Sequence, residues 1–406
     1  MFADQYIQNN IVYPSFIKEN SNPLPLMVVV IPCLNEPEII RTLESVWACE
    51  PINSYCEVIV AVNDSETSSQ EVKDFNHETF IKLVEWKKLY DRDNLILQPI
   101  YAPSVQAKFA GAGMARKIGM DEAVRRLNSI NKSEGVIISL DSDCLVSNNY
   151  LKRIETVFSE SKSCFAATIN FRHRFEEMDD PRQEMGIRLY EDYLHYYKQA
   201  LEYAGFPNSI YTIGSAFAVR AEAYVKQGGM NRRQAGEDFY FLHKLTKLGQ
   251  MTEINDVFVY PSGRVSDRVP FGTGAAMTKW KNHTDDLTRT YCLDAFLDLK
   301  QLFDRIGELY KVSSANYFDI LLSLPTTIQE YLIVVSFEEK LAEINRNSST
   351  PESFQKRFFQ AFDAFQVLKF LNMVHEKHYS TQNLREAIAQ LRMAEKIYLP
   401  FAQGYK

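Results

Sequence analysis

A short apolar run at residues 135–140 leads directly into two aspartates, Asp141 and Asp143. The run lacks alternation of apolar and polar residues, which is typical of a strand covered on both faces. Because side chains alternate along an extended backbone, the two carboxylates would point the same way. Ligands of open parallel sheets bind beyond the carboxyl ends of the strands. Two carboxylates there suit a divalent cation that holds a diphosphate, although aspartates also commonly cap turns and helices.

Strand-like and helical segments alternate along the first two thirds of the chain. Helical stretches end near Ala48, Tyr90 and Leu127, and strand-like segments lie on either side of each. This alternation predicts right-handed crossovers and an α/β fold with a Rossmann-like, mainly parallel sheet flanked by helices. The predicted strands are residues 26–32, 56–62, 95–100, 135–140, 165–171, 211–220 and 254–260.

The domain organisation follows from changes in residue pattern. Residues 1–24 are polar and aromatic without a clear period, and we expect an N-terminal arm there. Residues 25–278 contain the strand and helix alternation. From residue 279 to residue 406 the pattern changes to successive amphipathic helices, which predicts a helical C-terminal region.

Composition limits the functional classes. The 406 residues carry a net charge of −7, so no general attraction to nucleic acid is expected. Six cysteines without a CxxC pair indicate reduced, buried thiols. We expect no signal peptide, because the N-terminus lacks a charged region followed by an apolar one, and no apolar run reaches the about 20 residues that span a membrane. We therefore expect a cytoplasmic protein, and peripheral contact with the inner face of the membrane stays open.

Four short segments stand out for their order and spacing. They are residues 31–36, residues 63–65, the helix start at 113–119 with Asp141-Ser142-Asp143 downstream, and Gly236-Glu237-Asp238. Together they resemble the motifs of family 2 glycosyltransferases of the GT-A fold. The resemblance covers about residues 26–271 and excludes the helical C-terminal region.

The resemblance implies metal-dependent transfer of a sugar from a UDP- or GDP-sugar donor to an acceptor hydroxyl. The acceptor would be a glycan, a lipid-linked molecule or a small molecule. Residues 25–147 would bind the nucleotide, and residues 148–278 the acceptor. The residues implied for binding the nucleotide-sugar are Pro32, Asn35, Glu36, Asp64, Lys108, Arg116 and Asp141.

The resemblance also implies the catalytic and metal-binding residues. Asp238 would be the general base, with Glu237 beside it contacting the acceptor or the donor sugar. The implied ligands of Mn2+ or Mg2+ are Asp143, Asp141 and Asp267. Asp267 stands near the place where many relatives have a histidine, and the nearest histidine is His283.

One further departure from the family pattern is Lys117, which follows Arg116 where an asparagine is usual. The loop at residues 261–274 contains Arg264 and Arg268, both candidates for phosphate contact.

Physical chemistry connects these residues to one reaction. A bound divalent cation stabilises negative charge on the leaving diphosphate as a Lewis acid. A carboxylate within hydrogen-bond reach of the acceptor hydroxyl removes its proton, which is typically worth about 10²–10⁴ in rate. A single base at Asp238 predicts inversion at the anomeric carbon.

Two other functions fit parts of the pattern. In a phosphatase of the haloacid dehalogenase type, Asp141 would be the nucleophile and Asp143 the acid or base. That hypothesis leaves Glu237 and Asp238 unexplained. The second alternative is a catalytically silent glycosyltransferase-like scaffold, which lack of nucleotide binding would support.

Overall fold

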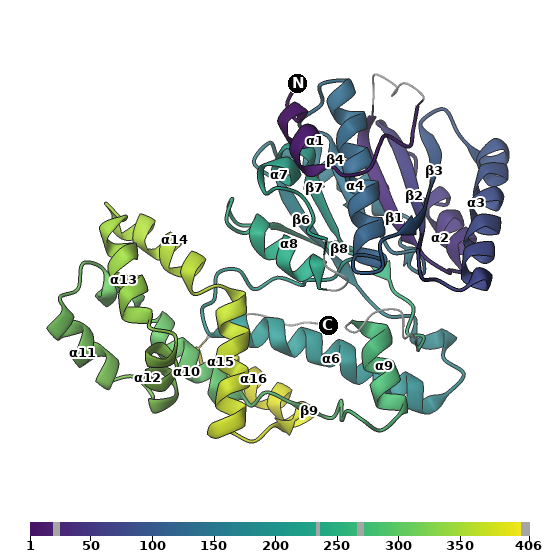
Figure 1. Ribbon diagram of the computed structural model, residues 1–406. Coiled ribbons are helices and arrows are strands. Elements are labelled where there is room, and N and C mark those ends of the chain that lie inside the picture. Colours follow the sequence, from purple (N-terminus) through teal and green to yellow (C-terminus); the bar gives the residue numbers. More distant parts are fainter. Residues whose placement is uncertain (19–24, 233–235, 266–271, 399–406) are drawn as a thin grey trace. The chain divides into compact units, whose positions relative to one another are not determined.

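The computed structural model divides into two compact units; its helices and strands are drawn in Figure 1. The residues that it describes are 1–18, 25–232, 236–265 and 272–398. The first unit comprises Met1–Ile187 and Thr212–Asn282, and the second comprises Arg188–Tyr211 and His283–Lys406. Residues 188–211 therefore group with the C-terminal helices, whereas the sequence pattern places them before residue 279.

The first unit is built on one twisted sheet. Its strands are β1 (Pro25–Cys33), β2 (Tyr55–Ser65), β3 (Leu95–Val105), β4 (Val136–Ser139), β5 (Leu145–Val146), β6 (Ala166–Phe171), β7 (Phe217–Arg220) and β8 (Thr252–Tyr260). In the described part of the chain they lie in the order β3-β2-β1-β4-β7-β6-β8-β5. Neighbours pair in parallel except where β7 meets β4 and β6 and where β5 meets β8. The expected fold class, a mainly parallel sheet flanked by helices, is confirmed.

Helices pack on both faces of this sheet. The helices of the first unit are α1 (Asp4–Asn10), α2 (Ile39–Trp47), α3 (Gln70–Tyr90), α4 (Ala112–Ser129), α5 (Tyr150–Glu160), η1 (Phe175–Glu177), α7 (Ala221–Lys226), α8 (Glu237–Leu245), α9 (Thr273–Lys281) and the start of α6 (Pro181–Tyr203). Val29 of β1 belongs to a core with Leu43 of α2 and Ile154 of α5. The next residue, Val30, faces α4, where a Cβ at Gly119 would lie 2.5 Å from its Cγ1. Glycine at this position lets α4 approach the sheet closely.

The edge formed by the carboxyl ends of β1 and β4 positions the candidate site. β1 lies between β2 and β4, and Val30 pairs with Ser139. The chain continues from β1 to β2 on one side, while β4 lies on the other. This is a topological switch point, where open α/β sheets leave a crevice for ligands.

Residues 4–10 of the expected N-terminal arm form the helix α1. The Tyr6 hydroxyl donates to Asp121 Oδ1 at 2.8 Å, and the Ala3 amide donates to Asn128 Oδ1 at 2.9 Å. Both acceptors belong to α4. Because a helix of 7 residues is marginal by itself, these tertiary contacts stabilise it, and no periodic pattern in the sequence indicates it.

The second unit is helical, as the sequence predicts for its C-terminal part. Its helices are the remainder of α6, α10 (Leu293–Phe303), η2 (Ile306–Leu309), α11 (Ser314–Leu322), α12 (Thr326–Val334), α13 (Phe337–Arg346), α14 (Pro351–Ala361), α15 (Ala364–Lys377) and α16 (Leu384–Tyr398). A two-stranded ribbon pairs β9 (Arg289–Thr290) with β10 (Gln382–Asn383). The core includes Phe362, whose ring stacks on Phe358 at 6.0 Å. Among the residues described, no helix has the length and apolar character to cross a membrane.

Candidate active site

The turn that follows β4 presents Asp141 and Asp143 at the sheet edge. Their side chains are 35% and 23% exposed, while Ser142 between them is buried. Two hydrogen bonds from other segments hold the backbone of the turn. Thr42 Oγ1 donates to the Ser142 carbonyl at 2.9 Å, and Arg174 Nη2 donates to the Asp143 carbonyl at 2.9 Å. Because the backbone is fixed by these bonds, the two carboxylates are held at the crevice.

Arg116 of α4 joins this turn to the start of α8. Its Nη2 donates to Asp141 Oδ1 at 2.6 Å, and its Nη1 donates to Glu237 Oε1. The Arg116 side chain is buried, which by itself lowers its pKa, but the carboxylates of Asp141, Glu237 and Asp238 outweigh burial and raise it. The guanidinium therefore stays charged and compensates these acids.

Glu237 and Asp238 occupy the first turn of α8, which begins after Gly236 in a left-handed conformation with φ of 70°. Asp238 Oδ1 accepts a hydrogen bond from the Phe239 amide at 2.7 Å. Burial raises the pKa of both carboxyl groups, against the opposing effect of the Arg116 charge. A raised pKa makes a carboxylate a stronger base.

Gly214 packs directly against this cluster from the segment before β7. A Cβ at Gly214 would lie 2.7 Å from Arg116 Nη2 and 2.9 Å from Asp238 Oδ2. The Gly214 carbonyl also accepts a hydrogen bond from Ser139 Oγ at 2.6 Å, which ties the segment to the end of β4. No sequence pattern indicates Gly214, because its role depends on contacts with residues distant in the chain.

A second ionic group lies at the end of β1. Glu36 is 1% exposed, its Oε1 accepts from the Glu38 amide at 2.9 Å, and its Oε2 accepts from Arg264 Nη2. The same Arg264 nitrogen lies 3.4 Å from Asp143 Oδ2. These carboxylates outweigh the effect of burial and raise the pKa of Arg264. Arg264 thus links the β1 turn to the β4 turn.

Asn76 of α3 forms hydrogen bonds to both the turn after β1 and the turn after β2. Asn76 Oδ1 accepts from the Asn35 amide at 2.8 Å, and Asn76 Nδ2 donates to the Asn63 carbonyl at 3.0 Å. Asp64, the next residue, is buried, and its Oδ1 accepts from the Ser104 amide at 2.7 Å. No motif in the sequence indicates Asn76, which lies inside the long polar helix α3.

The remaining predicted residues lie in different settings. Pro32 is within β1, and Lys108 is exposed, with its Nζ 4.7 Å from the ring of Phe109. Asp267 falls outside the described residues, as does Arg268. His283 belongs to the second unit.

Lys117 is turned into the protein interior. Its Nζ donates to Asp121 Oδ2 at 2.8 Å, and it lies 5.9 Å from the ring centroid of Tyr6. Asp121 is the residue that anchors α1 through Tyr6. The lysine that departs from the family pattern is therefore part of the contact between α1 and α4.

The donor set after β4 fits a hard divalent cation in type, because Mg2+ and Mn2+ prefer carboxylate oxygens. Asp141 and Asp143 both lie at the crevice, and each faces an arginine, Arg116 and Arg264 respectively. Within the described ranges, no group of three or more histidine, cysteine, aspartate or glutamate side chains is placed to hold a metal.

Comparisons with known proteins give low similarities. No family model matches the sequence, and no curated protein sequence matches it. The structure resembles TarS 1-349 from S. aureus in complex with UDP-GlcNAc, with 14% identity, 82% of this chain and 91% of that chain covered, and a TM-score of 0.41. It also resembles the mannosyltransferase PcManGT from Pyrobaculum calidifontis in complex with GDP-Man and Mn2+, with 12% identity, 97% and 91% coverage, and a TM-score of 0.40. Because both TM-scores are below 0.5, these similarities carry no conclusion about function.

Proposed function

We propose that the chain is a GT-A-type glycosyltransferase that moves a sugar from a UDP- or GDP-sugar to an acceptor hydroxyl with inversion. The observation that carries this proposal is the contact of Arg116 with both Asp141 and Glu237. It joins the acidic turn after β4 to the first turn of α8, where Asp238 stands. One site thus combines acids suited to a metal with a separate basic carboxylate.

The donor would lie in the crevice at the carboxyl ends of β1, β2 and β4. The nucleotide-sugar contacts that we propose are those of Pro32, Asn35, Glu36, Asp64, Lys108, Arg116 and Asp141. Asp143 and Asp141 would hold Mn2+ or Mg2+, which when bound stabilises negative charge on the diphosphate. Arg264 is placed to contact the same anion.

The acceptor hydroxyl would lose its proton to Asp238. Its Oδ1 is engaged by the Phe239 amide, which leaves Oδ2 as the proton-accepting atom. Arg116 forms an ion pair with the neighbouring Glu237, which would contact the acceptor or the donor sugar beside Asp238. We assign the acceptor side to residues 148–278, and a glycan, lipid-linked or small-molecule acceptor in the cytoplasm is compatible with the site.

The phosphatase alternative is weaker because it assigns no role to Glu237 and Asp238, although Glu237 shares Arg116 with Asp141. The scaffold alternative makes a distinct prediction, namely that neither nucleotide binds.

The first experiment is calorimetric titration of UDP and of GDP, each with Mn2+, into the wild-type chain and Asp143→Ala. We expect metal-dependent binding of one nucleotide that the variant loses. Asp256→Ala is the matched control, because Asp256 forms a surface ion pair with Arg153 and is 59% exposed. Failure of folded wild type to bind either nucleotide would contradict the proposal. Phosphatase activity without a nucleotide-sugar would favour the alternative.

A further inference from the structure

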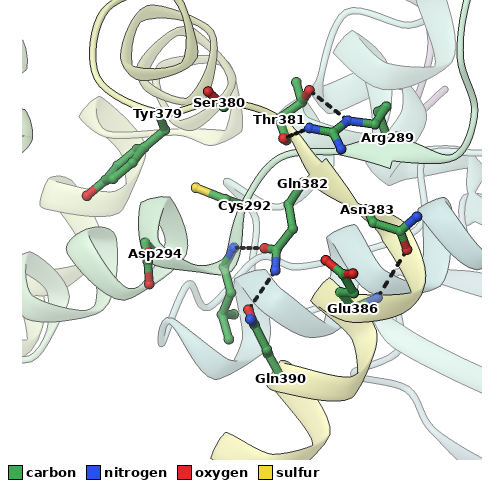
Figure 2. A pocket seen from close by; sticks show the side chains of 11 residues that line it. Arg289, Cys292, Asp294, Tyr379, Ser380, Thr381, Gln382, Asn383, Glu386 and Gln390 are labelled. Carbon is green, nitrogen blue, oxygen red and sulfur yellow. Dashed lines mark hydrogen bonds between the residues drawn. The ribbon is translucent and has the colours of Figure 1, made fainter.

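The second unit contains an open cavity of about 650 Å3 (Figure 2). It lies where the β9–β10 ribbon meets the first turns of α10 and α16. Hydrogen-bonding side chains dominate its lining: Gln382, Asn383, Glu386 and Gln390 on one side, and Asp294 and Tyr379 on the other. A cavity with this lining favours a polar ligand.

The charges of the lining disfavour an anionic ligand. Arg289 is the basic side chain of the cavity, and its guanidinium already donates to the Thr381 carbonyl and, at 3.2 Å, to Thr381 Oγ1. Asp294 and Glu386 supply negative charge in the first turns of α10 and α16. The cavity therefore suits an uncharged ligand rich in hydroxyl groups more than a phosphate.

The amide side chains of the cavity are held in fixed orientations. Gln382 Oε1 accepts from the Leu293 amide at 3.4 Å, and Gln382 Nε2 donates to Gln390 Oε1 at 2.9 Å. Asn383 Oδ1 accepts from the Arg385 amide at 3.0 Å. Among the described residues, Gln390 Nε2 and Asn383 Nδ2 donate no hydrogen bond. Both amide nitrogens can therefore donate to a ligand without breaking an existing bond.

A row of aromatic rings in the same unit leads to this cavity. Successive ring centroids are 6.5, 6.1, 6.3, 5.0 and 6.1 Å apart. All six side chains are half-buried. We call them the tyrosine row: Tyr190, Tyr193, Tyr197, Tyr291, His375 and Tyr379. Because Tyr379 also lines the cavity, the row and the cavity are continuous.

The choice of tyrosine along the row indicates more than packing. Tyr197 packs edge-on against Phe296 at 6.0 Å, so the inner edge of the row belongs to the core. The hydroxyls of Tyr193 and Tyr197 nevertheless make no hydrogen bond within the described part of the chain. A half-buried ring with a hydroxyl at its edge combines an apolar face with a polar tip, as a sugar ring does.

We infer that the helical unit binds a neutral glycan, with one sugar in the cavity and neighbouring sugars along the tyrosine row. The inference rests on the proposed function in one respect, namely that this glycan is the acceptor chain. The site itself requires only the amides of the cavity and the aromatic faces.

The test uses neutral tetrasaccharides of glucose, mannose, galactose and N-acetylglucosamine with the full chain, first by saturation-transfer NMR and then by calorimetry. We expect one class to bind, and Gln390→Ala and Tyr193→Ala each to raise its Kd by about fivefold or more. Gln355→Ala is the matched control, because Gln355 is also an exposed helical glutamine of this unit. Tyr193→Phe keeps the ring and removes only the hydroxyl, so its Kd should lie between those of wild type and Tyr193→Ala.

The outcomes separate this inference from the proposed function. If folded wild type binds UDP or GDP but none of the four glycans at millimolar concentration, the glycan site is wrong and the transferase proposal stands. If a glycan binds but Gln390→Ala and Tyr193→Ala match their controls, the location of the site is wrong. If a glycan binds in the expected way but neither nucleotide does, the glycan site stands and the transferase proposal fails.

Discussion

Arg264 Nη2 lies 3.4 Å from Asp143 Oδ2 and donates to Glu36 with the same nitrogen. A guanidinium thus contacts the carboxylate that we assign to the metal. A divalent cation and Arg264 compete for Asp143, because both are attracted to the same oxygen atoms. The diphosphate of a donor would offer Arg264 another anionic partner. Metal and nucleotide should therefore bind more tightly together than separately.

Arg264→Gln tests this competition. We expect tighter binding of Mn2+ alone, because Arg264 no longer competes with the cation for Asp143. We expect weaker binding of the nucleotide diphosphate, by about tenfold or more, because a hydrogen bond to a charged group is worth about 1.5–3 kcal/mol. Electron paramagnetic resonance measures the free Mn2+, and calorimetry measures the nucleotide. Arg172→Gln is the control, since Arg172 pairs with Glu176 at the surface. Unchanged Mn2+ affinity would contradict the competition.

Asp238→Asn tests the general base. We expect kcat to fall by about 10²–10⁴ with little change in nucleotide affinity, since the amide cannot accept the proton. In wild type, burial raises the pKa of Asp238, and the base works only when ionised. The rate should therefore fall as the pH drops through this raised pKa, beginning at a higher pH than the ordinary aspartate value of about 3.9 would give.

The pH profile of kcat/KM and the product configuration check this assignment. In Asp238→Asn the acid limb due to this group should disappear. A variant that keeps the wild-type rate, or a product with retained configuration, would assign the base elsewhere.

Arg116→Gln tests the charge compensation around Asp141 and Glu237. Removing one partner of a buried ion pair typically costs about 3–5 kcal/mol of unfolding free energy, because the other charge is left uncompensated. Without Arg116, the pKa of Glu237 should rise further above its unfolded value. A carboxyl group with a raised folded pKa favours the folded state when protonated, so the loss should be larger at about pH 8 than at about pH 5.

Urea unfolding at the two pH values measures this effect. The double variant Arg116→Gln/Glu237→Gln should recover much of the stability, because it also removes the Glu237 carboxylate, which lacks its ion-pair partner in the single variant. A single variant with wild-type stability at both pH values would show that the acids are compensated by other groups.

Asn76→Ala tests the coupling between the turns after β1 and β2. It leaves the Asn35 amide and the Asn63 carbonyl without their partner, which costs about 1–3 kcal/mol when such groups stay buried. Nucleotide affinity should fall too, because both turns flank the donor crevice. Asn94→Ala is the matched control, since Asn94 Nδ2 donates to the Ile52 carbonyl at 2.9 Å away from these turns. If both variants lower nucleotide affinity equally, the effect is general destabilisation.

The sequence predicted the parts of the site that depend on local patterns. An apolar run ending in Asp141 and Asp143 indicates a buried strand followed by a polar turn. In the structure, both aspartates lie just beyond the carboxyl end of β4. The sequence could not predict that Arg264 contacts Glu36, because the two residues are 228 positions apart. Arg116 and Glu237, which are 121 positions apart, were assigned separate roles, and their mutual contact appears only in the fold.

Tertiary packing also explains what the pattern missed. The helix α1 has no capping side chain and depends on Tyr6 reaching Asp121. Lys117 departs from the family pattern at the start of α4. Its ammonium group pairs with Asp121, the residue that also accepts from Tyr6 of α1. Periodicity and short motifs indicate the secondary structure of the segment that contains them. The roles of Tyr6 and Lys117 depend instead on a contact partner in another part of the chain or one turn away, Asp121.

Gly214→Ala tests the cluster without removing any of its functional groups. The new methyl group would lie 2.7 Å from Arg116 Nη2 and 2.9 Å from Asp238 Oδ2, so both must move. These atoms are the ends of flexible side chains, and we expect a loss of stability of only about 1 kcal/mol. Small displacements of catalytic groups can cost about 10²-fold in rate, so kcat should fall far more than stability.

Gly307→Ala is the matched control, because a Cβ there meets no heavy atom within 4 Å and Gly307 has no positive φ. Thermal unfolding and steady-state rates on both variants separate the two effects. Large loss of kcat in Gly214→Ala with near wild-type stability would support a cluster whose exact side-chain positions matter for the reaction. Equal rates in the two variants would mean that the reaction tolerates displacement of Arg116 and Asp238. Asp238 would then be a poor candidate for the general base, because proton transfer requires the base within hydrogen-bond reach of the acceptor hydroxyl.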